Sequence, residues 1–236
     1  MRDPEPLFSV PAATAPPQWS PTLCQDCQVS PRPSLTATRR NEILAATSTT
    51  IADRGLCETR IADIADHIGA SPALILYYFP SKAALLTEAL VYQDQMFHEA
   101  VKGELDNATS AAAKLDILIE ASCPKPTRGD GDLDGWVLWP AAWEMSRHDP
   151  TLAAARARLD ESWRAQIESI VEEGISAGEF TDVDASDFSI QLAALLDGLA
   201  IEVMLRDPTV DAARMRKLAF DFVELALNTL FDRRDT

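Results

Sequence analysis

The chain has 236 residues, and its 37 acidic residues against 21 basic ones give a formal net charge of −16. That length suits one large domain or a small domain followed by a larger one. No apolar run approaches the roughly 20 residues needed to cross a bilayer. The N-terminus lacks the charged and apolar regions of a secretory signal. We therefore expect a cytoplasmic protein without a membrane partner.

Residues 1–35 hold eight of the 15 prolines, a density that prevents a regular helix or sheet, so we expect a disordered, proline-rich tail. Cys24 and Cys27 in this tail form a CxxC pair, but no second pair or nearby histidine completes a tetrahedral metal site. We interpret the pair as a chance occurrence and expect no cofactor. After the tail, alanine and leucine are abundant and apolar residues recur at helical spacing, which predicts an all-α fold.

The first helix is expected from about Thr36 to Arg54, and the next segment, Thr59 to Lys82, is typical of two short helices joined by a tight turn. Gly69 suits the end of the first of these two helices, because glycine most easily adopts the left-handed conformation. Ser71 and Pro72 suit the start of the second, as a capping residue and a first-turn residue. Two helices in this arrangement place the second one in a DNA major groove.

The stretch from Arg39 to Leu86 resembles the DNA-binding domain of TetR-family repressors. Ala73 departs from the family pattern, which usually has glycine there, and Leu76 stands where tyrosine or histidine is common. The second departure leaves out one expected polar contact with DNA. The resemblance implies a three-helix DNA-binding domain over residues 36–82 and a larger helical ligand-binding and dimerisation domain over residues 83–236. The matching positions are Ile43 to Ala46, Gly55, Thr59, Ile64, Ala65, Gly69, Ser71, Phe79, Ser81, Lys82 and Leu85.

In the second helix of the motif, Ile75 and Phe79 are expected to face the domain core. This helix has no arginine, asparagine or glutamine, so bidentate reading of guanine or adenine cannot come from it. We expect specificity from thymine methyl contacts and DNA shape, with hydroxyl and ammonium groups on phosphates. An inward-packed Tyr78 and a solvated pair of Arg39 and Arg40 are the alternatives. The residues predicted to bind DNA are Arg39, Arg40, Thr59, Arg60, Ser71, Pro72, Ala73, Leu76, Tyr77, Tyr78 and Lys82.

The acidic charge is unevenly distributed. Residues 36–85 carry five basic and five acidic side chains, whereas the residues from 86 onward carry 14 basic and 29 acidic ones. The acidic excess would face away from DNA and repel phosphate. A neutral DNA-binding segment predicts modest nonspecific affinity and a shallow dependence of binding on salt.

Six further helices are expected after the DNA-binding motif. The last two are apolar nearly all round, so each must be buried on both sides. They are either internal core helices or a homodimer interface; we favour the dimer, because a symmetric operator presents two half-sites about 34 Å apart. The expected helices span about Lys82–Gly103, Ala111–Ser122, Leu133–Arg147 with an interruption at Pro140, Thr151–Ala177, Asp184–Arg206 and Val210–Phe231.

Three tryptophans fall at positions i, i+3 and i+7 of one expected helix, and a fourth lies in the next helix. Indole faces beside a carboxylate suit a quaternary or protonated amine; a purely structural tryptophan core is the alternative. The runs at 136–150, 162–180 and 195–200 resemble the C-terminal domain of the BetI-type branch, whose founding member responds to choline. That resemblance implies a small cationic or amphipathic inducer. The predicted ligand-binding residues are Trp136, Trp139, Trp143, Glu144, Trp163 and Asp197.

Together the two resemblances imply a ligand-responsive transcriptional regulator. In this interpretation a homodimeric repressor binds a palindromic, double-stranded DNA operator and is released by a small-molecule inducer. The alternative is an all-α interaction or small-molecule-binding protein that does not bind DNA. An enzyme is not expected, because His67, His98 and His148 are scattered and the sequence shows no phosphate-binding glycine loop or nucleophile motif.

Overall fold

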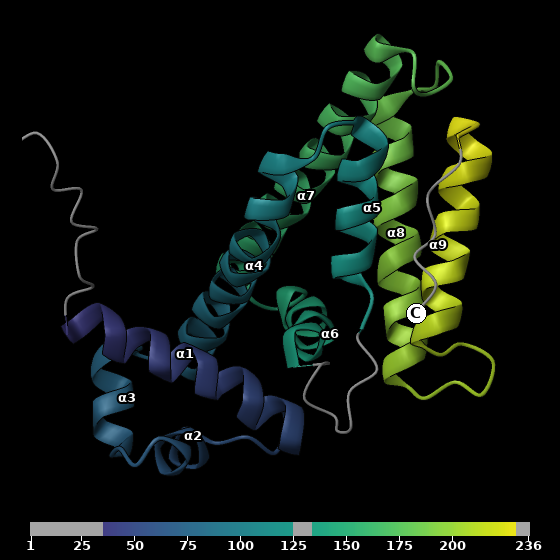
Figure 1. The fold of residues 1–236 in the computed structure, drawn as a ribbon. Helices are drawn as coiled ribbons and strands as arrows, with labels where there is room; N and C mark the ends of the chain where they lie inside the picture. The colour runs from purple at the N-terminus through teal and green to yellow at the C-terminus, as the bar shows by residue number, and fades with distance from the viewer. Residues whose placement is uncertain (1–34, 125–133, 230–236) are drawn as a thin grey trace, which may run out of the picture. The chain divides into compact units, whose positions relative to one another are not determined.

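The computed structural model describes residues 35–124 and 134–229, and every regular element in these ranges is an α-helix (Figure 1). The all-α prediction is confirmed, while the predicted tail and the CxxC pair lie outside the described residues. None of the described helices is by itself long and apolar enough to cross a membrane. The helices are α1 (Leu35–Arg54), α2 (Ile61–His67), α3 (Pro72–Tyr78), α4 (Lys82–Asn107), α5 (Ala111–Ser122), α6 (Asp134–Ser146), α7 (Pro150–Ala177), α8 (Ala185–Met204) and α9 (Ala212–Leu227).

Serine caps and a left-handed glycine define the helix-turn-helix segment, as the sequence predicted. Gly69, after the end of α2, has a φ of +61°, a conformation that a side chain would strain. The Ser71 hydroxyl accepts a hydrogen bond from the Leu74 amide at 3.2 Å and so caps α3. The Ser81 hydroxyl caps α4 in the same way. Each cap satisfies an amide that has no partner within its own helix.

Three helix ends differ from the sequence prediction. Helix α4 continues past Gly103 to Asn107, because Leu105 packs against the core and adds apolar contact to its last turn. Helix α8 ends at Met204 and is followed by Arg206 with a φ of +56°, and α9 ends at Leu227, where Asn228 has a φ of +49°. Left-handed residues stop a helix, and asparagine tolerates this conformation better than most residues.

The core of the DNA-binding segment continues into later helices. Ile43 of α1, Ile75 of α3 and Phe79 are fully buried in one hydrophobic cluster, and the same cluster includes Leu138 and Ala142 of α6. Helix α6 contacts α1 as well as α4 and α7. The described residues from Leu35 to residue 229 accordingly form one compact unit. In this unit, side chains from beyond residue 82 complete the core of the predicted 36–82 segment.

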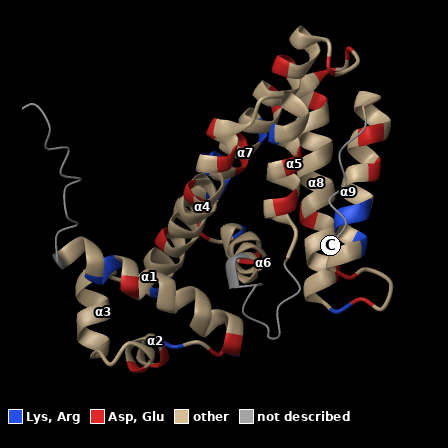
Figure 2. Cartoon of the chain, in the orientation of Figure 1, with Lys and Arg blue, Asp and Glu red and all other residues tan. Residues whose placement is uncertain are grey.

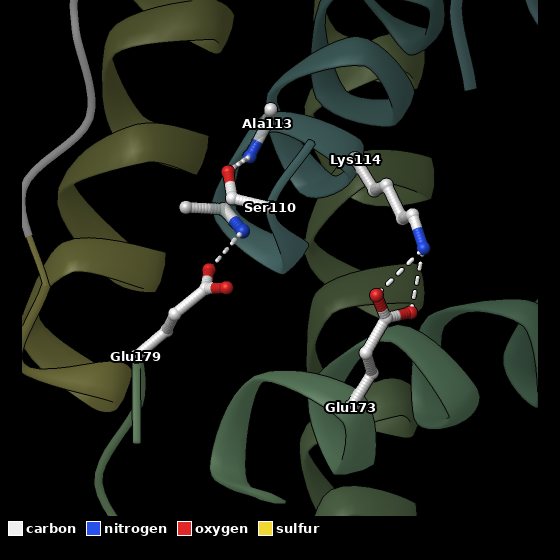
Figure 3. Close-up of polar contacts among 6 residues, drawn as sticks. Ser110, Ala113, Lys114, Glu173 and Glu179 are labelled. Carbon is white, nitrogen blue, oxygen red and sulfur yellow. Dashed lines mark hydrogen bonds and ion pairs between the residues drawn. The ribbon is translucent and has the colours of Figure 1, made fainter. Parts of the chain in front are cut away.

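A second hydrophobic cluster joins α5, α7, α8 and α9, which lie beside one another in Figure 1. Phe188 of α8 stacks on Phe222 of α9 with 5.6 Å between ring centroids. Two polar contacts fix the start of α5 (Figure 3): Lys114 Nζ lies 2.7 and 2.6 Å from the two carboxylate oxygens of Glu173, and the Ala112 amide donates to Glu179 at 3.1 Å. A carboxylate at a helix N-terminus also interacts favourably with the helix dipole.

One close contact within this second cluster leads to a specific prediction about stability. A Cβ atom on Gly174 would lie 2.1 Å from the buried ring of Phe180, so Gly174→Ala must displace the ring. We expect the free energy of unfolding to fall by about 1–3 kcal/mol, a typical cost of overpacking. Gly103→Ala is the matched control, because its Cβ meets nothing within 4 Å, and it should raise stability by about 0.5–1 kcal/mol through helix propensity. Denaturant unfolding measures both, and an equal gain in stability for the two variants would contradict the prediction.

Candidate functional site

Helix α3 presents an exposed, apolar surface at the place where the sequence predicts DNA contact. Tyr77 is 81% exposed and Leu76 is 47% exposed, whereas Ile75 and Phe79 are fully buried, as predicted. Figure 2 shows no charged residue on α3. The side chains that remain available to a groove are those of Ser71, Pro72, Ala73, Leu76 and Tyr77, all of them exposed.

Tyr78 takes the inward alternative. Its side chain is half-buried and packs against the core cluster of α1 to α4. Its ring meets the exposed Tyr77 ring edge-on, with 5.3 Å between centroids. Because Tyr77 is far more exposed than Tyr78, Tyr77 is the better placed of the two tyrosines for DNA.

Arg40 is partly exposed, but its guanidinium is engaged by other groups of the protein. Its guanidinium lies 4.5 Å from the centroid of the Phe79 ring, donates to the Tyr78 carbonyl at 3.3 Å and forms an ion pair with Glu88. These contacts join α1, the end of α3 and α4. Arg40 thus has a structural role that the sequence did not indicate.

Lys82 and Thr59 also have internal partners. Lys82 Nζ donates to the Leu56 carbonyl at 2.5 Å and ties the start of α4 to the loop before α2. Thr59 is buried, and its hydroxyl donates to the Gly55 carbonyl at 2.8 Å. The expected phosphate contact through the Thr59 side chain is therefore not available in this conformation, because burial leaves no path to solvent. Arg60, immediately after it, is exposed.

A cavity of about 580 Å³ is lined mainly by residues of α4, α6, α7 and α8, and also by the end of α5 and the two residues after it. All four tryptophans predicted for the ligand site line it: Trp136, Trp139 and Trp143 from α6 and Trp163 from α7. Trp163 meets the ring of Phe97 edge-on at 5.6 Å between centroids, and Trp139 and Trp143 lie 6.4 Å apart. The tryptophans are half-buried, so part of each indole remains available to a ligand.

Three carboxyl groups face this cavity, and burial raises the pKa of each of them. Burial, with a further contribution from Asp160, raises the pKa of Asp197 to about 6. Burial likewise raises the pKa of Asp160, although Arg156 and Arg164 oppose this, and it raises the pKa of Asp94, which His98 opposes from 3.7 Å. A bound cation would stabilise the charged form of each group, so the cavity is electrostatically suited to one.

Glu144 does not line the cavity and is exposed, contrary to the expectation from sequence. It follows Trp143 directly, and consecutive helical residues point about 100° apart. Asp94 and Phe97 of α4 and Asp160 of α7 do line it, although the sequence reasoning did not include them. Asp94 and Phe97 are three residues apart, as are Asp160 and Trp163, so each pair shares a helix face. This spacing indicates that each pair shares a helix face, but it does not reveal which helices pack together.

Comparisons with known proteins agree with both parts of the site. Residues 43–89 match the family of bacterial regulatory proteins called TetR, and residues 111–228 match the C-terminal domain of BetI-type transcriptional repressors. The chain belongs to the TetR family. It is therefore a helix-turn-helix transcriptional regulator with a BetI-type C-terminal domain, and the predicted function, a ligand-responsive regulator rather than an enzyme, is confirmed at this level.

The matches with individual relatives extend over nearly the whole length of those proteins. The HTH-type transcriptional regulator BetI of Ectopseudomonas mendocina is 28% identical over 84% of this chain and 98% of that protein. BetI of Escherichia coli K12 is 27% identical over 84% of this chain and 99% of its own length. A transcriptional regulator from Saccharomonospora viridis, whose crystal structure contains choline, is 32% identical with a TM-score of 0.74, covering 80% of this chain and 97% of that one.

The different surroundings of two neighbouring arginines lead to a test of their roles. In the described part of the chain, Arg39 pairs with the exposed Glu42 on its own helix, at 2.7 Å, and such surface pairs contribute little. Arg40→Ala should lower the free energy of unfolding by about 1–2 kcal/mol, because it removes charge-assisted and cation–π contacts. Arg39→Ala should change it by less than about 0.5 kcal/mol. Equal effects of the two substitutions in denaturant unfolding would refute a structural role for Arg40.

Proposed function

We propose that the protein is a homodimeric repressor whose operator affinity falls when a choline-like organic cation enters the α4–α6–α7–α8 cavity. The observation that carries the proposal is the convergence of four tryptophans and Asp197 on one cavity. A cation over an indole face gains about 0.5–2 kcal/mol, and more when water is excluded. The choline in the Saccharomonospora viridis regulator supports the same ligand class.

Exposed apolar side chains near the ends of the last two helices, together with the family, support dimer formation. Leu205 after α8 and Leu225 of α9 are 72% and 85% exposed. Large apolar side chains at solvent positions on adjacent helices suit a symmetric interface with a second copy. Two subunits would present two α3 helices to half-sites about 34 Å apart.

The DNA-binding surface supports recognition by shape and methyl contacts. Helix α3 offers small and apolar groups, with the Tyr77 hydroxyl as its exposed polar donor besides Ser71. Arg39 and Arg60 are the remaining arginines placed to reach phosphates, since Arg40 is held by Glu88 and the Phe79 ring. With few phosphates neutralised, the dependence of operator affinity on salt is expected to be shallow.

Coupling between the cavity and DNA runs through α6 and α4. Both helices line the cavity, and both pack against α1. A ligand that fits the cavity in only one arrangement of these helices shifts the population toward that arrangement. Coupling of 1–3 kcal/mol, which is typical of such systems, changes operator affinity about 5–150-fold.

The function is tested by fluorescence anisotropy on the DNA that flanks the protein's own coding region. The dimer should bind this DNA, and choline should weaken the binding within the range given above. Tyr77→Ala should reduce DNA affinity without altering the binding of choline, because the cavity lies in a different part of the chain. Asp197→Asn should bind the DNA like the unmodified protein and respond poorly to choline. A monomer in solution with no affinity for this DNA would overturn the proposal.

The pKa of Asp197 gives the cavity a predictable pH dependence. With a pKa of about 6, Asp197 is ionised above pH 6 and takes up a proton below it, so choline affinity should fall as the pH drops through 6. The limit is about tenfold per pH unit for one proton. Asp94 beside His98, and Asp160 beside Arg156 and Arg164, face the same cavity. Asp197→Asn therefore isolates the contribution of Asp197 to the pH dependence. In calorimetric titrations, the choline affinity of this variant should be lower at pH 7.5 and should change less between pH 7.5 and 5. A variant as steep as the unmodified protein would assign the dependence to another group.

A further inference from the structure

The charged groups of the cavity are unequally partnered. Asp160 forms an ion pair with Arg156, one helical turn away, and Asp94 lies 3.7 Å from His98. Within residues 35–124 and 134–229, Arg164 and Asp197 have neither a hydrogen bond nor an ion pair, although both line the cavity. Among the described residues, the cavity therefore has one carboxyl and one guanidinium that form no hydrogen bond or ion pair.

These two groups do not neutralise each other. Arg164 acts on Asp160, one turn before it on α7, and lowers the pKa of that carboxyl. Asp197, on α8, has its pKa raised to about 6 by burial and by Asp160, the opposite of the effect that a neighbouring guanidinium produces. Arg164 and Asp197 line the cavity from different helices, α7 and α8, and no ion pair joins them in the described part of the chain.

The size of the cavity leaves room for a ligand with two charged ends. Its volume of about 580 Å³ falls in the range of roughly 300–1,000 Å³ that holds drug-sized ligands. A small quaternary ammonium ion among the tryptophans would occupy only part of it. Arg164 is half-buried at its wall, and its planar guanidinium suits bidentate binding of a carboxylate or phosphate.

We propose that the preferred ligand is a zwitterion, with an organic ammonium held by the tryptophans and Asp197 and an anionic oxygen group bound by Arg164. This inference rests on the proposed function, because it places the cation in the same cavity. It adds a selectivity that a cation site alone does not have. A molecule such as choline would occupy the ammonium position and leave Arg164 without a partner.

The test compares three probes that share a trimethylammonium group: choline, glycine betaine with a carboxylate, and phosphocholine with a phosphate. Calorimetric titration of the full-length protein at pH 7.5 should show at least one of the two zwitterions binding about tenfold or more tightly than choline, the effect of one charge-assisted hydrogen bond. Which of the two binds better distinguishes a carboxylate ligand from a phosphate ligand.

Variants of Arg164 then assign the preference. Arg164→Gln should remove the preference for the zwitterion without weakening choline binding, because it removes a positive charge from the cavity wall. Arg164→Lys, which keeps the charge, should retain part of the preference. Arg158→Gln is the matched control, because Arg158 lies on the same helix, is exposed and does not line the cavity. Thermal unfolding of each variant verifies that it is folded.

The outcomes separate this inference from the function beneath it. Choline binding without preference for either zwitterion, or a preference that survives Arg164→Gln, overturns the zwitterion inference and leaves the cation site intact. If none of the three probes binds the unmodified protein, the proposed cation site itself is refuted.

Discussion

Helix α6 is apolar on two sides, and both halves of the described structure depend on how it is placed. Leu138 and Ala142 are fully buried in the cluster that holds Ile43 of α1, whereas Trp136 and Trp143 line the cavity. A helix buried on two faces cannot turn or slide without disturbing both neighbours, because protein interiors are packed as tightly as organic crystals. The DNA-binding helices and the ligand cavity thus share one wall.

The cavity combines apolar and charged groups, and the proposed preference for a cation rests on that combination. Buried carboxyl groups are costly when ionised, and the raised pKa of Asp197 expresses that cost. A ligand cation lowers this cost of ionisation and therefore binds more tightly, whereas a neutral apolar molecule of the same size does not. The indoles add attraction for a cation that costs them little desolvation. Selectivity then resides in charge placement rather than in shape alone.

Local sequence patterns predicted the local structure well. Spacing of apolar residues placed Ile75 and Phe79 inward, and serine, proline and glycine marked the ends of α2 and α3. These features are decided within a few residues of chain. The tryptophan stripe on α6 was predicted for the same reason, since i, i+3 and i+7 share one face.

Features that depend on distant contacts were not predictable in this way. Arg40 was predicted to bind DNA, and the sequence did not indicate its ion pair with Glu88, 48 residues later, or its contact with the Phe79 ring. Asp94 and Asp160 reach the cavity only because α4 and α7 pack together. The ends of α8 and α9 were set by backbone conformation at Arg206 and Asn228, which hydrophobic periodicity does not reveal.

The hydrogen bond between Gln93 and Ser48 links the cavity wall directly to helix α1. Gln93 lines the cavity, and its Nε2 donates to the hydroxyl of Ser48, buried on α1, at 2.7 Å. The Gln93 side chain cannot turn toward an incoming ligand without breaking its hydrogen bond to Ser48. A buried hydroxyl that loses its hydrogen-bond donor costs free energy. A change in the rotamer of Gln93 would therefore affect α1, the first helix of the DNA-binding segment, through one hydrogen bond and without an intermediate residue.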